Sequence, residues 1–133
     1  MNNLQKIIIL WLLFVVCMIF HFNYHVGELF YGIDIKRPNA NGVVPISAAI
    51  VRFVFEILPM MFITFLMFIE KAWLRVFNYS VSILYTLANA AHLFQELRSE
   101  KFDLSQINLL SFVLALSLLL NLASWKWLKE SSQ

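Results

Sequence analysis

One apolar stretch of the sequence carries polar side chains at a regular interval. Between residues 78 and 96 the polar positions follow one another at steps of four, three, four, three and four, and they are Asn78, Ser82, Tyr85, Asn89, His92 and Glu96. Residues three and four apart lie on the same face of an α-helix, so all six are expected on one face. The other positions are mostly Val, Ile, Leu, Ala and Phe, which suit lipid or apolar neighbours. The stretch therefore predicts a membrane helix with a polar seam.

Four apolar runs are long enough to cross a hydrocarbon core of about 30 Å at ~1.5 Å per residue. They cover residues 7–30, 46–69, 74–97 and 105–128. Pro59 interrupts the second run, where it removes a backbone donor and predicts a kink. The last two links are short and only the link at 31–45 is long, so successive helices are expected side by side. The pattern predicts an all-α membrane protein: one domain, 1–133, forming an up-and-down bundle of four transmembrane helices with both termini on the same side.

The composition agrees with a membrane protein. Of the 133 residues, 61% are hydrophobic and 14% are charged, whereas soluble domains carry about 25% charged residues. The charges lie at the ends of the apolar runs and form no clustered basic patch, so nucleic acid is excluded as a partner. Cys17 is the only cysteine, which rules out an intramolecular disulfide and any cluster held by several thiolates.

The start of the chain has a basic residue before an apolar run, as a signal peptide does. His21, Phe22 and Asn23 stand where a cleavage site of small residues would follow, so the run is expected to be retained. The expected terminal side carries Lys6, Lys71, Arg75, Lys126 and Lys129, and the other side carries Lys36, Arg37, Arg98 and Lys101. By the positive-inside rule this bias of five to four predicts cytoplasmic termini in a bacterial cytoplasmic (inner) membrane.

Polar residues of three runs fall at a similar depth, in the outer half of the bilayer. The first run brings His21, His25 and Glu28; the second brings Arg52 and Glu56; the third brings Asn89, His92 and Glu96. Ionisable groups are costly in hydrocarbon unless they find partners or face a water-filled cavity. These side chains are therefore expected to meet in one network, which is either a ligand pocket or a purely structural arrangement.

Several of these residues also have a structural interpretation. The His25 side chain could extend to the membrane–water interface, and Glu28 and Glu96 could lie at solvated helix ends. Arg52 and Glu56 are four residues apart, which allows an intrahelical ion pair that neutralises both. Asparagines inside membranes commonly join helices through hydrogen bonds, and this interpretation applies to Asn89 and Asn121.

If the network is a pocket, it would suit a small amphipathic or lipid-like ligand that enters from the membrane. The candidates for acid–base catalysis are Glu56 and His92, and Arg52 could meet an anionic headgroup. The candidate ligand-binding residues are His21, His25, Glu28, Arg52, Tyr85, Asn89 and Glu96. Whether the protein is an enzyme is left open.

Two further alternatives stay open. The first is a metal site built from His21, His25 and His92, or a haem held between His21 or His25 and His92. It is not favoured, because Arg52 in the same layer opposes a cation, and the cofactor remains unknown. The second is a non-enzymatic accessory or assembly subunit of a larger membrane complex, whose polar seam contacts a partner helix. Partner proteins and a homo-oligomer are both compatible with the sequence.

The layout resembles two families of small four-helix membrane proteins. Glu56 and the stretch Lys71-Ala72-Trp73-Leu74-Arg75 are similar to the DoxX-like group, although Ile57-Leu58-Pro59 stands where that group has a glycine-rich run. The stretch 53–59, with its acidic, aromatic and proline residues, and Glu28 at the end of the first run resemble the EXPERA group of sterol isomerases and sigma-2-receptor-like proteins. The second resemblance implies a sterol-like or lipid-like ligand in an intramembrane cavity, with Glu and His at the chemistry.

Overall fold

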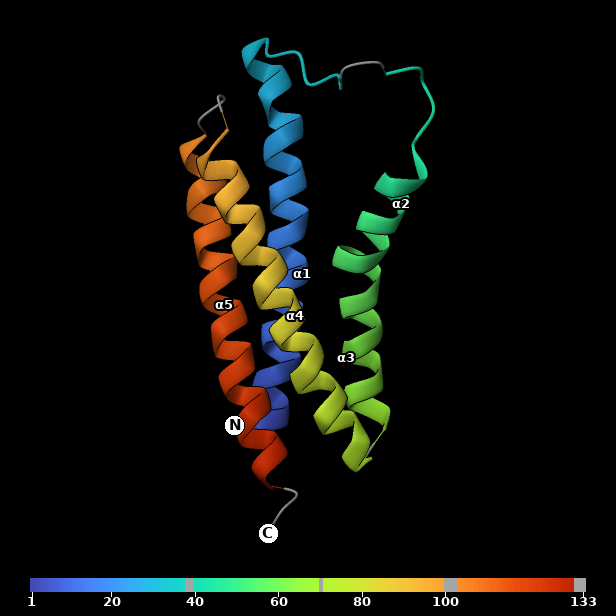
Figure 1. The fold of residues 1–133 in the computed structure, drawn as a ribbon, viewed down its shortest axis with the longest axis vertical. Coiled ribbons are helices and arrows are strands. Elements are labelled where there is room, and N and C mark those ends of the chain that lie inside the picture. The colour runs from blue at the N-terminus through green and yellow to red at the C-terminus, as the bar shows by residue number, and fades with distance from the viewer. Residues whose placement is uncertain (38–39, 70, 100–102, 131–133) are drawn as a thin grey trace.

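The computed structural model describes residues 1–37, 40–69, 71–99 and 103–130, and these residues form helices and loops without any strand (Figure 1). The helical elements are α1 (Asn3–Gly27), η1 (Glu28–Tyr31), α2 (Ile46–Arg52), η2 (Phe53–Ile57), α3 (Leu58–Phe68), α4 (Ala72–Leu97) and α5 (Leu104–Lys129). They match the four predicted runs within a few residues at each end. Glu70 of the second link and Lys101 of the third lie outside the described residues.

Local chemistry explains where two of the long helices begin. Asn2 caps α1: its side chain accepts from the backbone N–H of Gln5, whose own side chain bonds back to Asn2. Asp103 caps α5 by accepting from the N–H groups of Ser105 and Gln106. Each cap satisfies donors that have no partner within the first helical turn.

Three helices share one packing period. The buried stripe of α4 includes Asn78, Ser82, Tyr85 and Asn89, and the stripes of α1 and α5 repeat the same alternation of four and three residues. In α1 it runs Ile7, Trp11, Phe14, Met18; in α5 it runs Gln106, Leu110, Val113, Ser117, Leu120, Ser124, Trp127. A mean step of 3.5 residues keeps one face of each helix towards its neighbours, as in coiled-coil-like bundles. The closest pairings are α4 with α5 and α1 with α5.

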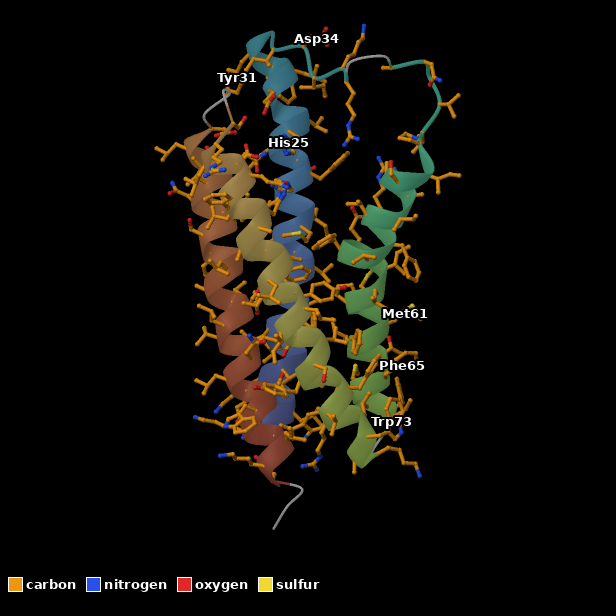
Figure 2. The ribbon with its side chains drawn as sticks, in the orientation of Figure 1. His25, Tyr31, Asp34, Met61, Phe65 and Trp73 are labelled. Atoms are coloured by element: carbon orange, nitrogen blue, oxygen red, sulfur yellow. The ribbon has the colours of Figure 1, made fainter. Side chains whose placement is uncertain are left out.

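The rod formed by α2, η2 and α3 joins this three-helix unit unevenly. The α3 end docks on α1 and buries Pro59, Phe62 and Leu66, whereas no residue of α2 or η2 is buried. Figure 1 shows the α2 end standing away from the other helices, and Figure 2 shows Met61 and Phe65 on the outer side of α3. The second helical rod is thus fixed at one end and open at the other.

Three helical segments are long and apolar enough to cross a membrane: Asn3–Tyr31, Ile46–Phe68 and Leu104–Lys129. These segments support a membrane-embedded protein. The helix α4 is not among them, because its seam residues lower its hydropathy, so its membrane span stays a prediction. The two chain ends lie at the same end of the molecule (Figure 1), where Asn3 Nδ2 donates to Glu130 Oε1 at 2.7 Å.

Candidate functional site

The polar seam of α4 faces the interior of this chain. Asn78 and Ser82 are fully buried, and Tyr85 and Asn89 are 6% and 3% exposed. These four side chains and Leu74 are the buried residues of α4, so the predicted single face is confirmed for this part of the seam. His92 and Glu96, nearer the end of α4, are half-buried.

The deepest part of the seam joins three helices through one side chain. The indole N–H of Trp11 on α1 donates to Asn78 Oδ1 at 2.9 Å. The amide of Asn78 in turn donates to Ser124 Oγ on α5 at 2.8 Å. An amide can accept and donate at once, and a hydrocarbon side chain here would leave the indole N–H without a partner. Asn78 therefore connects α1, α4 and α5.

Two further asparagines link α4 to α5. Asn89 Nδ2 donates to Ser117 Oγ at 2.8 Å, and Asn121 Nδ2 donates to Thr86 Oγ1 at 2.9 Å. These bonds confirm the interhelical role predicted for both asparagines. The buried Oδ1 of Asn121 has no partner in the described part of the chain. The bond to Ser117 uses one N–H of Asn89, and its predicted contact with a ligand stays a prediction.

Tyr85 completes the hydrogen bonding of the second rod. In the π-helical turn η2 the N–H of Leu58 bonds the carbonyl of Phe53, five residues back. The next carbonyl, that of Val54, would take the N–H of residue 59 in the same pattern, but Pro59 has none. The Tyr85 hydroxyl donates to the Val54 carbonyl instead. The interruption predicted at Pro59 is thus a π-helical turn with its missing donor supplied by α4.

A chain of hydrogen bonds runs through the histidines. His92 Nε2 lies 3.1 Å from His21 Nε2, and His21 Nδ1 lies 2.6 Å from Gln106 Oε1. The Gln106 amide donates to the His21 carbonyl at 3.3 Å, which leaves its oxygen to accept from His21. Consequently His21 carries its proton on Nδ1, its Nε2 accepts, and His92 donates from Nε2. The Nδ1 atom of His92 is left over for another partner.

His25 and Glu28 extend this cluster toward the long loop. The His25 ring contacts the His21 ring edge-on with 4.7 Å between centroids, and its Nδ1 lies 3.6 Å from Glu28 Oε1. Figure 2 shows His25 in the part of α1 nearest the loop. Glu96 lies one helical turn beyond His92. The structure thus brings the first-run histidines together with His92, at the level that was predicted by counting residues.

The metal alternative gains no support from this cluster. Both ring nitrogens of His21 are used, one in the bond with His92 and one in the bond with Gln106. Within residues 1–37, 40–69, 71–99 and 103–130, no group of three or more His, Cys, Asp or Glu side chains could hold a metal ion. His92, His21 and Gln106 form a donor–acceptor row, and His25 contacts His21 only edge-on.

Arg52 and Glu56 do not join the histidine network. Arg52 is exposed and Glu56 is half-buried, and neither side chain has a hydrogen bond or ion pair within the described ranges. The predicted ion pair between them is therefore wrong. A π-helical turn begins at Phe53 and closes over five residues, which takes positions four apart out of alignment. Of the residues that were predicted to meet, the histidines form one cluster. Arg52 and Glu56 lie apart from it, without partners among the described residues.

Gln106 is the site residue that the sequence analysis missed. It is fully buried and contacts both the ring and the backbone of His21. Its position one turn inside the last apolar run made it resemble an ordinary polar helix start. Its spacing of 11 and 18 residues from Ser117 and Ser124 continues the four-three period, and this period was the signal that could have identified it.

Two hollows lie outside the seam. The larger, of about 740 Å³, is at the loop end and is lined by residues that include Tyr24, Glu28, Tyr31 and Asp103. The smaller, of about 340 Å³, lies between α1 and α5 near the termini. Glu28 is the predicted ligand residue that reaches either one. The seam itself is packed with side chains that bond to one another.

Comparisons of the chain with models of protein families, with curated proteins and with solved structures find no match. The likeness to the DoxX-like and EXPERA groups therefore rests on the residues quoted for it alone.

Proposed function

We propose that this protein binds a small amphipathic, lipid-like ligand beside α2 and η2, within the membrane. The observation that carries this proposal is a pair of charges, Arg52 and Glu56, that have no partner among the described residues and lie in a helical segment apolar enough to cross a membrane. Ionisable side chains at such positions are costly and usually meet a partner or line a cavity. A ligand with an anionic group for Arg52 and a proton donor for Glu56 would supply both.

The hydrogen bond between Tyr85 and Val54 gives a reference point along the helix axes for Arg52 and His92. At ~1.5 Å per residue, Arg52 lies about 3 Å from that bond toward the loop end, and His92 lies about 10 Å from it in the same direction. An elongated ligand along α2 could therefore contact Arg52 and approach His92. The candidates for acid–base chemistry are the Glu56 carboxylate and His92 Nδ1, which has no partner among the described residues. On the same count they lie about 13 Å apart along the helix axes, so they would act at different points of an elongated ligand.

The membrane arrangement belongs to the same proposal. We propose that α4 also crosses the bilayer, so that four transmembrane helices run up and down with both termini in the cytoplasm of a bacterial-type cell. The shared position of the two chain ends (Figure 1) supports an even number of crossings. The excess of Lys and Arg on the terminal side supports the orientation.

If the protein is an accessory subunit, its contact surface would differ from the polar seam that was predicted. The seam is buried in its own chain, so it offers little to a partner helix. The exposed residues Ile50 and Val51 of α2 and Phe53 at the start of η2 supply an alternative contact face. A partner with an acidic group would also satisfy Arg52.

The test is native mass spectrometry of the detergent-purified protein after incubation with membrane lipid extract. The wild type should retain one more small amphipathic molecule per chain than Arg52→Gln and Glu56→Gln do. Arg37→Gln is the matched control, because Arg37 is an exposed arginine of the long loop, and it should retain as many molecules as the wild type. Equal numbers of retained molecules in all variants would contradict the proposal, and stoichiometric copurification of a larger membrane protein would favour the accessory subunit.

A further inference from the structure

The hollow near the termini has apolar walls and a basic mouth. It lies between α1 and α5 and has a volume of about 340 Å³, within the range of small-ligand pockets. The residues that matter for its chemistry are Lys6, Ile9, Leu10, Leu119, Leu122 and Lys126. We call this feature the terminal groove.

The helix periods give the terminal groove a polar end and an apolar end. Ile9 and Leu10 follow Lys6 by three and four residues, and Leu122 and Leu119 precede Lys126 by four and seven. Such spacings lie on one helix face. Because α1 and α5 run in opposite directions, both lysines fall at the terminal end and the apolar residues lie deeper. The groove has the polarity of an amphipathic molecule that stands parallel to the helices.

Lys6 and Lys126 differ from Arg75 and Lys129 in having no partner among the described residues. Neither Lys6 nor Lys126 has a side-chain hydrogen bond, ion pair or ring contact with the described part of the chain. By contrast, Arg75 donates to the Trp127 carbonyl at 2.9 Å, and Lys129 lies 4.5 Å from the Trp125 ring. The Glu130 carboxylate beside the groove is bonded to Asn3. Two positive charges thus remain at the mouth of the groove.

The neighbouring tryptophan places this mouth at the membrane surface. Trp125 precedes Lys126 and is 42% exposed, and exposed tryptophans of membrane helices collect at the level of the lipid headgroups. Lysines at that level attract anionic lipids. Deeper along the groove, Ile9, Leu119 and Leu122 are exposed apolar residues that suit an acyl chain.

We propose that the terminal groove binds one anionic phospholipid, with its phosphate between Lys6 and Lys126 and an acyl chain along Ile9, Leu119 and Leu122. A zwitterionic phospholipid fits the same walls but lacks the net charge that the two lysines would recognise. The site lies at the opposite end of the molecule from the long loop and does not depend on Arg52 or Glu56. It can therefore exist whether or not the proposed ligand site does.

The experiment is a lipid titration of the full chain by native mass spectrometry in detergent, with phosphatidylglycerol and phosphatidylcholine of the same acyl chains. Phosphatidylglycerol should bind more tightly than phosphatidylcholine by at least about tenfold, since each lysine near an anionic lipid is worth roughly a fivefold change in affinity. The double variant Lys6→Gln, Lys126→Gln should remove this preference. Lys71→Gln, Lys129→Gln is the matched control with the same charge and should keep it.

Two further arms test the walls and the source of the phosphate. Leu122→Trp fills the groove from an exposed position and should weaken binding of phosphatidylglycerol while both lysines remain. Inorganic phosphate at millimolar concentration should not displace the lipid, because it has no acyl chain. Equal binding of the two lipids, unchanged selectivity in the Lys6, Lys126 double variant, or displacement by free phosphate would each overturn the proposal. Circular dichroism of every variant checks that the helices are intact.

Discussion

His92 donates the N–H of Nε2 to Nε2 of His21 across 3.1 Å, and this direction is set by a third residue on a third helix. Gln106 accepts from the opposite nitrogen of His21 and so fixes where the proton of that ring lies. Two histidines that look equivalent in the sequence are thereby given different roles. His21 is held on both sides, whereas His92 keeps Nδ1 for another partner.

The first prediction concerns Gln106. Replacement by Leu should cost about 1–3 kcal/mol of unfolding free energy, because it leaves the half-buried ring of His21 without its partner at Nδ1. The same change should remove the fixed position of the His21 proton. Nitrogen-15 NMR of histidine-labelled protein in micelles reads the protonated nitrogen directly. Gln95→Leu, at an exposed position of α4, is the control and should leave both the His21 signals and the stability unchanged.

The second prediction links Tyr85 to Pro59. Tyr85→Phe should destabilise the fold by about 1 kcal/mol, since it removes one hydrogen bond from a carbonyl in an apolar region. In a Pro59→Ala background residue 59 regains an N–H that can serve the second rod, so the same Tyr85→Phe change should cost clearly less. A double-mutant cycle of unfolding free energies in detergent measures this coupling. Strict additivity of the two changes would contradict the assignment of Tyr85 as the replacement donor.

The third prediction concerns Glu56, whose carboxylate has no partner in the described chain. Glu56→Leu should raise the thermal stability of ligand-free protein, by about 1 kcal/mol or more, because an unpaired acidic group is removed from a membrane segment. It should also reduce retention of the proposed ligand. Glu28→Leu serves as the comparison, since Glu28 lies within 3.6 Å of His25 and its loss should bring no gain. A loss of stability in Glu56→Leu would mean that Glu56 has a structural role.

The sequence predicted the structure correctly where the helical period alone decides which residues are buried. The four-three spacing of polar residues in α4 predicted the buried face correctly, because polar residues stand out against an apolar background. The same period in α1 and α5 is carried mostly by apolar residues, so nothing distinguished the buried Leu110 or Val113 from lipid-facing neighbours. Gln106 is polar, but it lies at the start of its run, where it resembled an ordinary polar helix start.

Counting residues along the helices predicted correctly that the histidines meet. It did not predict the arrangement of the charges in the second rod. His21 and His92 meet as predicted because α1 and α4 are regular helices in which depth follows residue number. Arg52 and Glu56 do not pair because the chain becomes π-helical between them, which no count of 3.6 residues per turn anticipates. The open α2 end could not be predicted either, since its apolar residues are equally compatible with packing and with lipid.

The bond between Tyr85 and Val54 has a consequence for the order in which the protein is made. During synthesis Val54 leaves the ribosome some thirty residues before Tyr85. While the turn η2 is π-helical, the N–H of Leu58 is bonded to Phe53, so the Val54 carbonyl has no donor from its own segment until α4 arrives, and hydrocarbon offers none. The second rod therefore lacks one hydrogen bond when it is inserted without α4. Its maturation waits for the next helix, so the nascent chain has a stage at which translocation machinery or water must shelter a polar group that the finished protein hides.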